Sequence, residues 1–230
     1  MRILVTGTGR GGTTLAREVI IGLELIKFHC DNSKEEDRRL FKHKRLPKHY
    51  GTKLTTPTTP GENGYTIESL MRLMKKYDDL YVVFSFRHPI DTCMSKIVRG
   101  QTHSNGGDKY WDQISDDGTV ESAIKTVRVM HAIYEKVKKS FPKRVYVIKM
   151  ENLILHPKEE ISKVANFFNV KVRKRALVFY RYNSNPYQFR RYGTAIDKSQ
   201  VDLYKKWDTA YGGFFKNRKK DIDRMREAFE

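Results

Sequence analysis

The amino-acid sequence predicts an α/β fold of three layers, in which helices flank both faces of a mainly parallel central sheet. An apolar strand at residues 2–6 runs into a glycine-rich loop and then directly into a helical pattern. Candidate strands and helices alternate along the rest of the chain, as parallel strands joined by crossover helices do. The clearest strand, residues 80–86 (LYVVFSF), is apolar on both faces, which is typical of a strand buried within a parallel sheet.

The first half of the chain is expected to hold two further strands and two helices. The apolar positions of residues 13–25 recur at helical spacing, and residues 25–29 (LIKFH) are a candidate second strand. Residues 50–54 (YGTKL) are a candidate third strand ahead of the turn-rich loop TTPTTPGENG. Residues 66–77 are apolar on one side only, which predicts an amphipathic helix.

The second half continues the alternation. Pro89 suits the first turn of a helix, which we expect to run to about Arg99. Residues 120–140 predict a long helix and residues 144–150 a strand, and Pro157 begins another helix.

The length of 230 residues fits one large domain, and we expect a single domain over residues 1–230. Towards its end the chain becomes basic and aromatic. Residues 171–230 are expected to form a lid or subdomain within that domain, with helices at residues 199–208 and 217–229.

The charge of the chain indicates an anionic partner. Lys and Arg number 45 against 27 Asp and Glu, so the formal net charge is +18. Such a surface attracts polyanions, among them nucleic acids, anionic lipids, sulfated or phosphorylated sugars and nucleotides, and the charge alone does not choose among them.

The sequence also favours a reducing, cytoplasmic setting. Cys30 and Cys93 both lie in apolar surroundings and are expected to be free thiols. The first strand begins at Arg2, which leaves no room for a signal peptide, and no apolar run approaches the roughly 20 residues of a membrane span.

The glycine-rich loop GTGRGGTT (residues 7–14) fits a dinucleotide-binding pattern and, less completely, a triphosphate-binding one. Gly7, Gly9 and Gly12 match the dinucleotide pattern G-x-G-x-x-G, and Asp31 follows at the distance of a ribose-binding acid. The spacing of Tyr134 and Lys138 matches the Y-x-x-x-K pair of short-chain dehydrogenases, but that spacing arises equally on a solvated helix face. A nicotinamide-dependent oxidoreductase therefore stays an alternative, as does a non-enzymatic module that binds polyanions.

The nucleoside-triphosphatase pattern G-x-x-x-x-G-K-[ST] fits the same loop except at Thr13, which stands where the lysine belongs. The best later strand ends in Arg87, where such proteins carry the acid that binds Mg²⁺. A ligand that binds without metal, and whose charge is met by arginines and backbone amides, accounts for both differences.

Four segments together resemble the sulfotransferases that use 3′-phosphoadenosine 5′-phosphosulfate (PAPS). GRGGTT resembles their 5′-phosphosulfate loop P-[KR]-S-G-T-T, although Gly9 and Gly11 replace its proline and serine. FRHPIDTCMS, residues 86–95, resembles their 3′-phosphate motif R-x-P-x-D-x-x-x-S. YGTKLTTP resembles the G-D-K-T-P segment of the bacterial and carbohydrate members, and residues 149–170 resemble a later structural segment. The C-terminal sixty residues lack the family's R-K-G-x-x-G pattern.

The resemblance implies a P-loop-like fold, a sulfotransferase activity and a role for each matching residue. PAPS, and its product adenosine 3′,5′-bisphosphate (PAP), would bind at two anion sites without a metal. Arg10 and Lys53 would stabilise the oxygen that leaves, and Arg87 with Ser95 would bind the 3′-phosphate. The 5′ end would bind to the loop residues Gly9, Arg10, Gly11, Gly12, Thr13 and Thr14.

The remaining roles concern the acceptor and a lid. The acceptor would be a hydroxyl or amine of a carbohydrate or other small or glycan substrate, with nucleic acid disfavoured. Asp31 is preferred over His49 as the general base, because acidic bases in related branches lie a similar distance beyond the loop. Arg190 or Arg191, in the run FYRYNSNPYQFRRY, is expected to complete the 3′-phosphate site from a lid. The aromatic side chains Tyr110 and Trp111 are candidates for stacking on a sugar.

Overall fold

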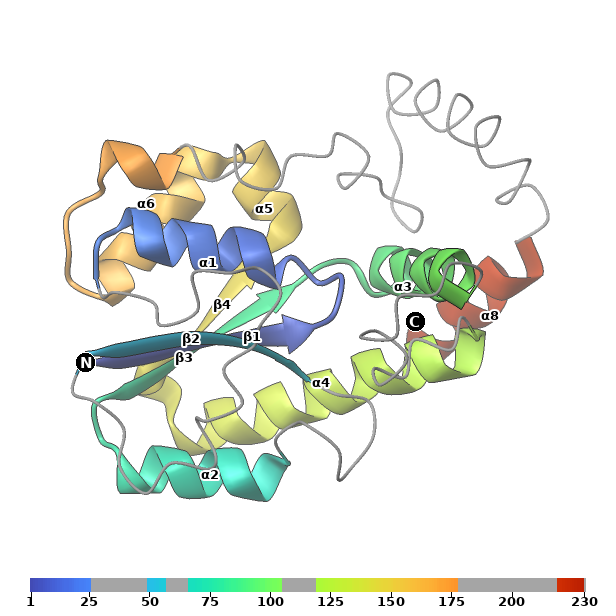
Figure 1. Ribbon diagram of the computed structural model, residues 1–230, viewed down its shortest axis with the longest axis horizontal. Coiled ribbons are helices and arrows are strands. Elements are labelled where there is room, and N and C mark those ends of the chain that lie inside the picture. The colour runs from blue at the N-terminus through green and yellow to red at the C-terminus, as the bar shows by residue number, and fades with distance from the viewer. Residues whose placement is uncertain (26–48, 57–65, 105–118, 178–218, 230) are drawn as a thin grey trace.

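The computed structural model describes residues 1–25, 49–56, 66–104, 119–177 and 219–229. Within these residues, four strands form one parallel sheet in the order β2-β1-β3-β4 (Figure 1). The strands are β1 (Arg2–Thr8), β2 (Tyr50–Thr56), β3 (Leu80–Phe86) and β4 (Val145–Lys149).

Helices cover both faces of this sheet (Figure 1). One face packs against α1 (Thr13–Gly22), α5 (Met150–Leu155) and α6 (Pro157–Phe167), and the other against α2 (Ile67–Lys76) and α4 (Val120–Ser140). Each face has its own core of buried apolar side chains, because alternate residues of a strand point to opposite faces. The predicted fold of three layers around a parallel sheet is confirmed.

Two helices lie beyond the carboxyl ends of the strands. α3 (Pro89–Ser104) follows β3, and α8 (Lys219–Phe229) packs beside it and beside α4 (Figure 1). A third apolar cluster holds these three helices together, with Met225 of α8 fully buried among Cys93, Met94 and Ile97 of α3. The last helix therefore packs against α3, the helix that follows β3 at the carboxyl edge of the sheet.

Most of the predicted elements appear with small shifts. β3 and α4 have the predicted limits, whereas β1 runs two residues further than expected and α3 five. The first helix ends at Gly22 rather than residue 25, and α5 was not predicted at all. The strand at residues 25–29, except Leu25, and the helix at 199–208 lie outside the described residues.

Polar side chains fix where the helices begin. Thr66 and Ser69 form a reciprocal capping box at α2, in which each side chain accepts a hydrogen bond from the other's backbone N–H. Thr119 accepts from the N–H of Ser122 at 3.2 Å and caps α4. Pro157 occupies the first position of α6, as the sequence predicted.

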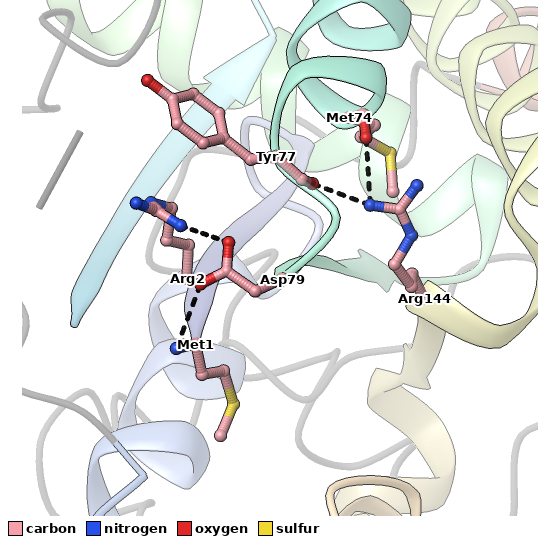
Figure 2. A network of polar contacts seen from close by, with 6 residues as sticks. All are labelled: Met1, Arg2, Met74, Tyr77, Asp79 and Arg144. Carbon is pink, nitrogen blue, oxygen red and sulfur yellow. Dashed lines mark hydrogen bonds and ion pairs between the residues drawn. The ribbon is translucent and has the colours of Figure 1, made fainter. Parts of the chain in front are cut away.

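A network of cations fastens the amino ends of the strands, at the edge opposite the glycine-rich loop (Figure 2). The Asp79 carboxylate pairs with the N-terminal ammonium at 3.2 Å and with Arg2, whose guanidinium also lies over the Tyr77 ring. Arg144 donates to the carbonyl oxygens of Met74 and Tyr77, at 3.0 and 2.7 Å. The contacts join β1, the end of α2 and the residues before β4.

We expect Asp79→Asn to lower the free energy of unfolding by about 1 kcal/mol or less at pH 7, because the Asp79 side chain is 35% exposed. Burial disfavours the charged form, but hydrogen bonds from the N-terminal ammonium and Arg2 outweigh it and lower the pKa of Asp79 below its ordinary 3.8. Because the pKa is lowered, the charged Asp79 stabilises the fold at pH values above 3.8. This stabilisation is lost as the pH falls through the lower pKa of the folded state. Urea unfolding of both proteins at pH 7 and pH 3 should show the difference shrinking in acid; a constant difference would contradict the assignment.

Candidate functional site

The glycine-rich loop joins β1 to α1 at the carboxyl edge of the sheet. Two hydrogen bonds fix it: the N–H of Gly11 donates to the Thr8 carbonyl at 2.9 Å, and the Ser85 hydroxyl donates to the Gly11 carbonyl at 2.8 Å. Ser85 belongs to β3, so the loop is tied to both central strands.

Two residues of the loop have left-handed backbone conformations. Gly12, the N-cap of α1, has φ 88°, which suits a residue without a Cβ. Arg10 has φ 69°, a conformation that costs a residue with a side chain roughly 1–2 kcal/mol. Strain of this kind at a loop edge points to a functional role for the residue that bears it.

The start of α1 offers backbone donors to a ligand. The first N–H groups of a helix have no partner within it, and Gly12 has no side chain with which to cap them. They and the helix dipole attract an anion to this end. Thr13 is buried and Thr14 half-buried in the same turn.

The structure brings the loop and the predicted 3′-phosphate motif into contact. Nε of Arg10 donates to the Ser95 hydroxyl at 3.0 Å, although 85 residues separate them in the chain. Ser95 lies in the second turn of α3, and Arg87 immediately follows β3. The side chain predicted to act on the leaving group thus touches one predicted to bind the distant phosphate.

Lys96 is a cation of this edge that the sequence reasoning missed. It is only 3% exposed, and its Nζ lies 3.8 Å from the position that a Cβ on Gly9 would take. Its neighbour in the motif, Ser95, is the signal that would have drawn attention to it. Arg10 and Lys96 therefore both bring positive charge to the loop.

The thiol of Cys93, on the same helix, takes no part in this chemistry. Cys93 is a buried free cysteine, as predicted, and Cys30 lies outside the described residues. Burial raises the pKa of Cys93 to about 12, against a smaller opposing effect of Lys96. The thiol is therefore protonated at neutral pH and is a packing group.

Two adjacent residues of the unpredicted α5 also reach this edge. Met150 packs against Gly12, and the Glu151 carboxylate accepts a hydrogen bond from the backbone N–H of His88 at 2.8 Å. Their segment resembles only a structural part of the family, and no motif in it connects these residues to the loop.

Lys53 and His49, both proposed as catalytic, lie at different heights along the sheet. Lys53 is buried in β2 and pairs with Val5, on the face of the sheet that α1 covers. It lies two residues before Thr55, which pairs with Gly7 at the start of the loop. His49 is exposed at the opposite end, before the pairing of Tyr50 with Arg2, and thus about 20 Å from the loop along the strand. This position gives no support to His49 as the base.

The residues that supported a short-chain dehydrogenase have packing roles. The Tyr134 ring packs edge-on against Phe84 and Phe86, and burial raises the pKa of its phenol, with Glu135 adding to the effect. The Lys138 ammonium donates to the carbonyl oxygens of Pro142 and Val145 at 3.0 and 2.9 Å. The pair therefore holds α4 against the sheet, on the face away from the loop.

The other candidates fall outside the described residues. These are Asp31, Arg190, Arg191, Tyr110 and Trp111. Among the described residues no group of three His, Cys, Asp or Glu is arranged to hold a metal ion, and no helix is long and apolar enough to cross a membrane.

Known structures share this fold. The chain is 15% identical to a mouse sulfotransferase, SULT7A1, solved in complex with PAP, over 100% of this chain and 89% of that one, with a TM-score of 0.55. It is 15% identical to the sulfotransferase domain of the curacin biosynthetic pathway, with 77% of each chain covered and a TM-score of 0.51. For the sulfotransferase domain of the Synechococcus PCC 7002 olefin synthase the identity is 12%, the coverage 90% and 94%, and the TM-score 0.52.

The sequence itself matches the model of a protein family. No match to a curated protein sequence was found. The family model described as "Sulfotransferase family" matches residues 25–174, which are more than half of the chain and include the Arg87–Ser95 motif and the α5 segment. The parallel sheet, the placement of that motif beside the glycine-rich loop and this match agree, and the chain belongs to the sulfotransferase family.

Proposed function

We propose that this protein transfers a sulfuryl group from PAPS to a hydroxyl or amine of an acceptor, with PAP as the other product. Membership of the family gives the reaction class. The observation that supports PAPS as the sulfuryl donor is the contact of Arg10 with Ser95. It places the loop, with its backbone N–H groups, beside the helix that begins just after Arg87. A ligand with two anionic groups, one at each segment, fits that arrangement.

In the proposed reaction, the acceptor oxygen attacks sulfur in line with the bond that breaks. The bond between sulfur and the bridging phosphate oxygen breaks, that oxygen takes up negative charge, and the acceptor proton passes to a base. The N–H groups at the start of α1, with Arg10 and Lys96, are the groups able to stabilise the leaving oxygen. Lys53 of β2 lies on the face of the sheet that α1 covers and is a further candidate for this role.

Several finer assignments remain part of the proposal. Asp31 is the preferred base, a glycan the preferred acceptor, and Arg190 or Arg191 the completing contact from a lid within a single domain. The bacterial and carbohydrate branch is proposed from the sequence motifs, and a reducing, cytoplasmic location from the expected free thiols. Two anion sites built from arginine and backbone amides favour a reaction that proceeds without a bound metal.

Calorimetric titration and thermal shift with PAP, NADPH and Mg-ATP test the proposal. We expect PAP to bind, and at 100 times its Kd to stabilise the fold by about 2.7 kcal/mol. A response to NADPH without one to PAP would contradict it. Sulfuryl transfer from labelled PAPS to a panel of sugars, lipids and phenols would then identify the acceptor class.

A further inference from the structure

The residues Met150 and Glu151 contact the two anion-binding segments from one point in the fold. They follow β4 directly and begin α5. One side chain touches the loop that precedes α1, and the other holds the turn between β3 and α3. The two segments also contact each other directly, through the bonds from Ser85 to Gly11 and from Arg10 to Ser95.

The contact with the loop is a close steric one. The Met150 side chain is 4% exposed, and a Cβ built on Gly12 would lie 2.1 Å from its sulfur. The thioether therefore packs on the main chain of Gly12, the N-cap of α1. A buried side chain in such a position limits how far the loop can move toward β4.

The contact with the turn is a charged hydrogen bond. The Glu151 carboxylate accepts from the N–H of His88 at 2.8 Å, within the range of charge-assisted bonds. Because the donor is a backbone group, the bond fixes the main chain at His88 and so limits the position of Arg87, the preceding residue. The turn continues into α3 through the bond from the Thr92 N–H to the His88 carbonyl, at 2.9 Å.

We propose that Met150 and Glu151 form a brace that sets the spacing between the two anion subsites, with Glu151 as a positioning residue for a ligand that carries two phosphates. Consecutive Cα atoms lie about 3.8 Å apart, so the two contacts tie both segments to nearly the same place. A nucleoside separates the two phosphates of PAP by a nearly fixed distance. Subsites held at that distance bind the second phosphate at a high effective concentration. This inference rests on the proposed function.

Charge and position make opposite predictions for Glu151. A carboxylate close to an anion site repels the ligand, so its removal should tighten binding if charge were its only effect. If it is a brace, loss of the bond to His88 should weaken binding, and only for a ligand that uses both subsites. Two conservative variants separate these effects: Glu151→Gln loses the charge and keeps an acceptor at the same reach, and Glu151→Asp keeps the charge and falls one methylene short.

The test is calorimetric titration of the full chain with PAP and with adenosine 5′-monophosphate. We expect Glu151→Asp and Glu151→Ala to weaken PAP binding by about 10-fold or more, and to change the affinity for the monophosphate less than about 2-fold. Glu151→Gln should bind both ligands within about 3-fold of wild type. Glu159→Ala, which removes an exposed carboxylate from α6, is the matched control and should change neither affinity.

Other results would overturn the brace. Tighter PAP binding by Glu151→Gln and Glu151→Ala, with unchanged PAP affinity in Glu151→Asp, would show that Glu151 affects binding through its charge alone. Equal weakening of both nucleotides would show a general structural loss. If the alanine variant does not fold, the aspartate and glutamine variants decide the question by themselves. Wild type that binds neither nucleotide would overturn the proposed function together with the brace, whereas wild type that binds PAP normally beside unaffected variants would overturn the brace alone.

Discussion

Replacing Arg10 with alanine is expected to lower kcat by roughly 100-fold or more, with a much smaller loss of affinity for PAP. The negative charge on the leaving oxygen develops in the transition state, so a cation beside it contributes most when the bond breaks. The left-handed conformation of Arg10 is consistent with this role, because the fold maintains an unfavourable φ of 69° to place that side chain. Steady-state kinetics with PAPS and titration with PAP give the two quantities.

Two controls separate the guanidinium from its backbone. Arg10→Gly removes the same side chain and also relieves the backbone strain. Its kcat should fall as in the alanine variant, but its free energy of unfolding should be about 1 kcal/mol higher than that of Arg10→Ala. Arg72→Ala removes an exposed arginine from α2 and should leave turnover unchanged. A rise in KM with kcat preserved would show that Arg10 binds the donor equally in the ground and transition states.

Replacing Arg87 with alanine is expected to weaken PAP binding by roughly 10- to 150-fold, the loss typical of a charge-assisted contact. The affinity for adenosine 5′-phosphosulfate, which lacks the 3′-phosphate, should barely change. Wild type should strongly prefer the 3′-phosphorylated nucleotide, and the variant should lose most of that preference. Calorimetric titration of the two nucleotides against both proteins gives the comparison.

Arg87→Lys refines this test, because lysine keeps the charge and loses the planar fork that matches a phosphate. We expect an intermediate affinity for PAP and an unchanged affinity for the 5′-phosphosulfate. Should Arg87→Ala weaken the two nucleotides equally, Arg87 would not recognise the 3′-phosphate, and the motif at residues 86–95 would need a different role.

The sequence predicted those elements whose pattern is long or buried throughout. β3 is apolar on both faces and α4 holds its apolar stripe for 21 residues, so both limits were found. α5 has six residues, too few for a helical period to show. Alternation of strands and helices gave the parallel sheet, but the order β2-β1-β3-β4 depends on which crossovers pack together, and no local pattern records that.

The candidate site was predicted as a set of segments and not as a set of contacts. Arg10, Arg87 and Ser95 were found because each lies in a short motif. The bond from Arg10 to Ser95, and the approach of Lys96 to Gly9, depend on the rotation of α3 about its axis after β3. That rotation is set by packing against α4 and α8, which are distant in the chain.

The place of α8 has a consequence for the synthesis of the protein. Met225 covers an apolar surface on α3 and α4 that is made long before α8 itself. At 5–20 residues per second, the ribosome needs about 4 to 16 s to proceed from Ser140 to Lys219. During that time the nascent chain exposes apolar side chains of the helix that carries Ser95, and this surface is where a chaperone would bind it. Docking of α8 on α3 and α4 is therefore among the last events of folding.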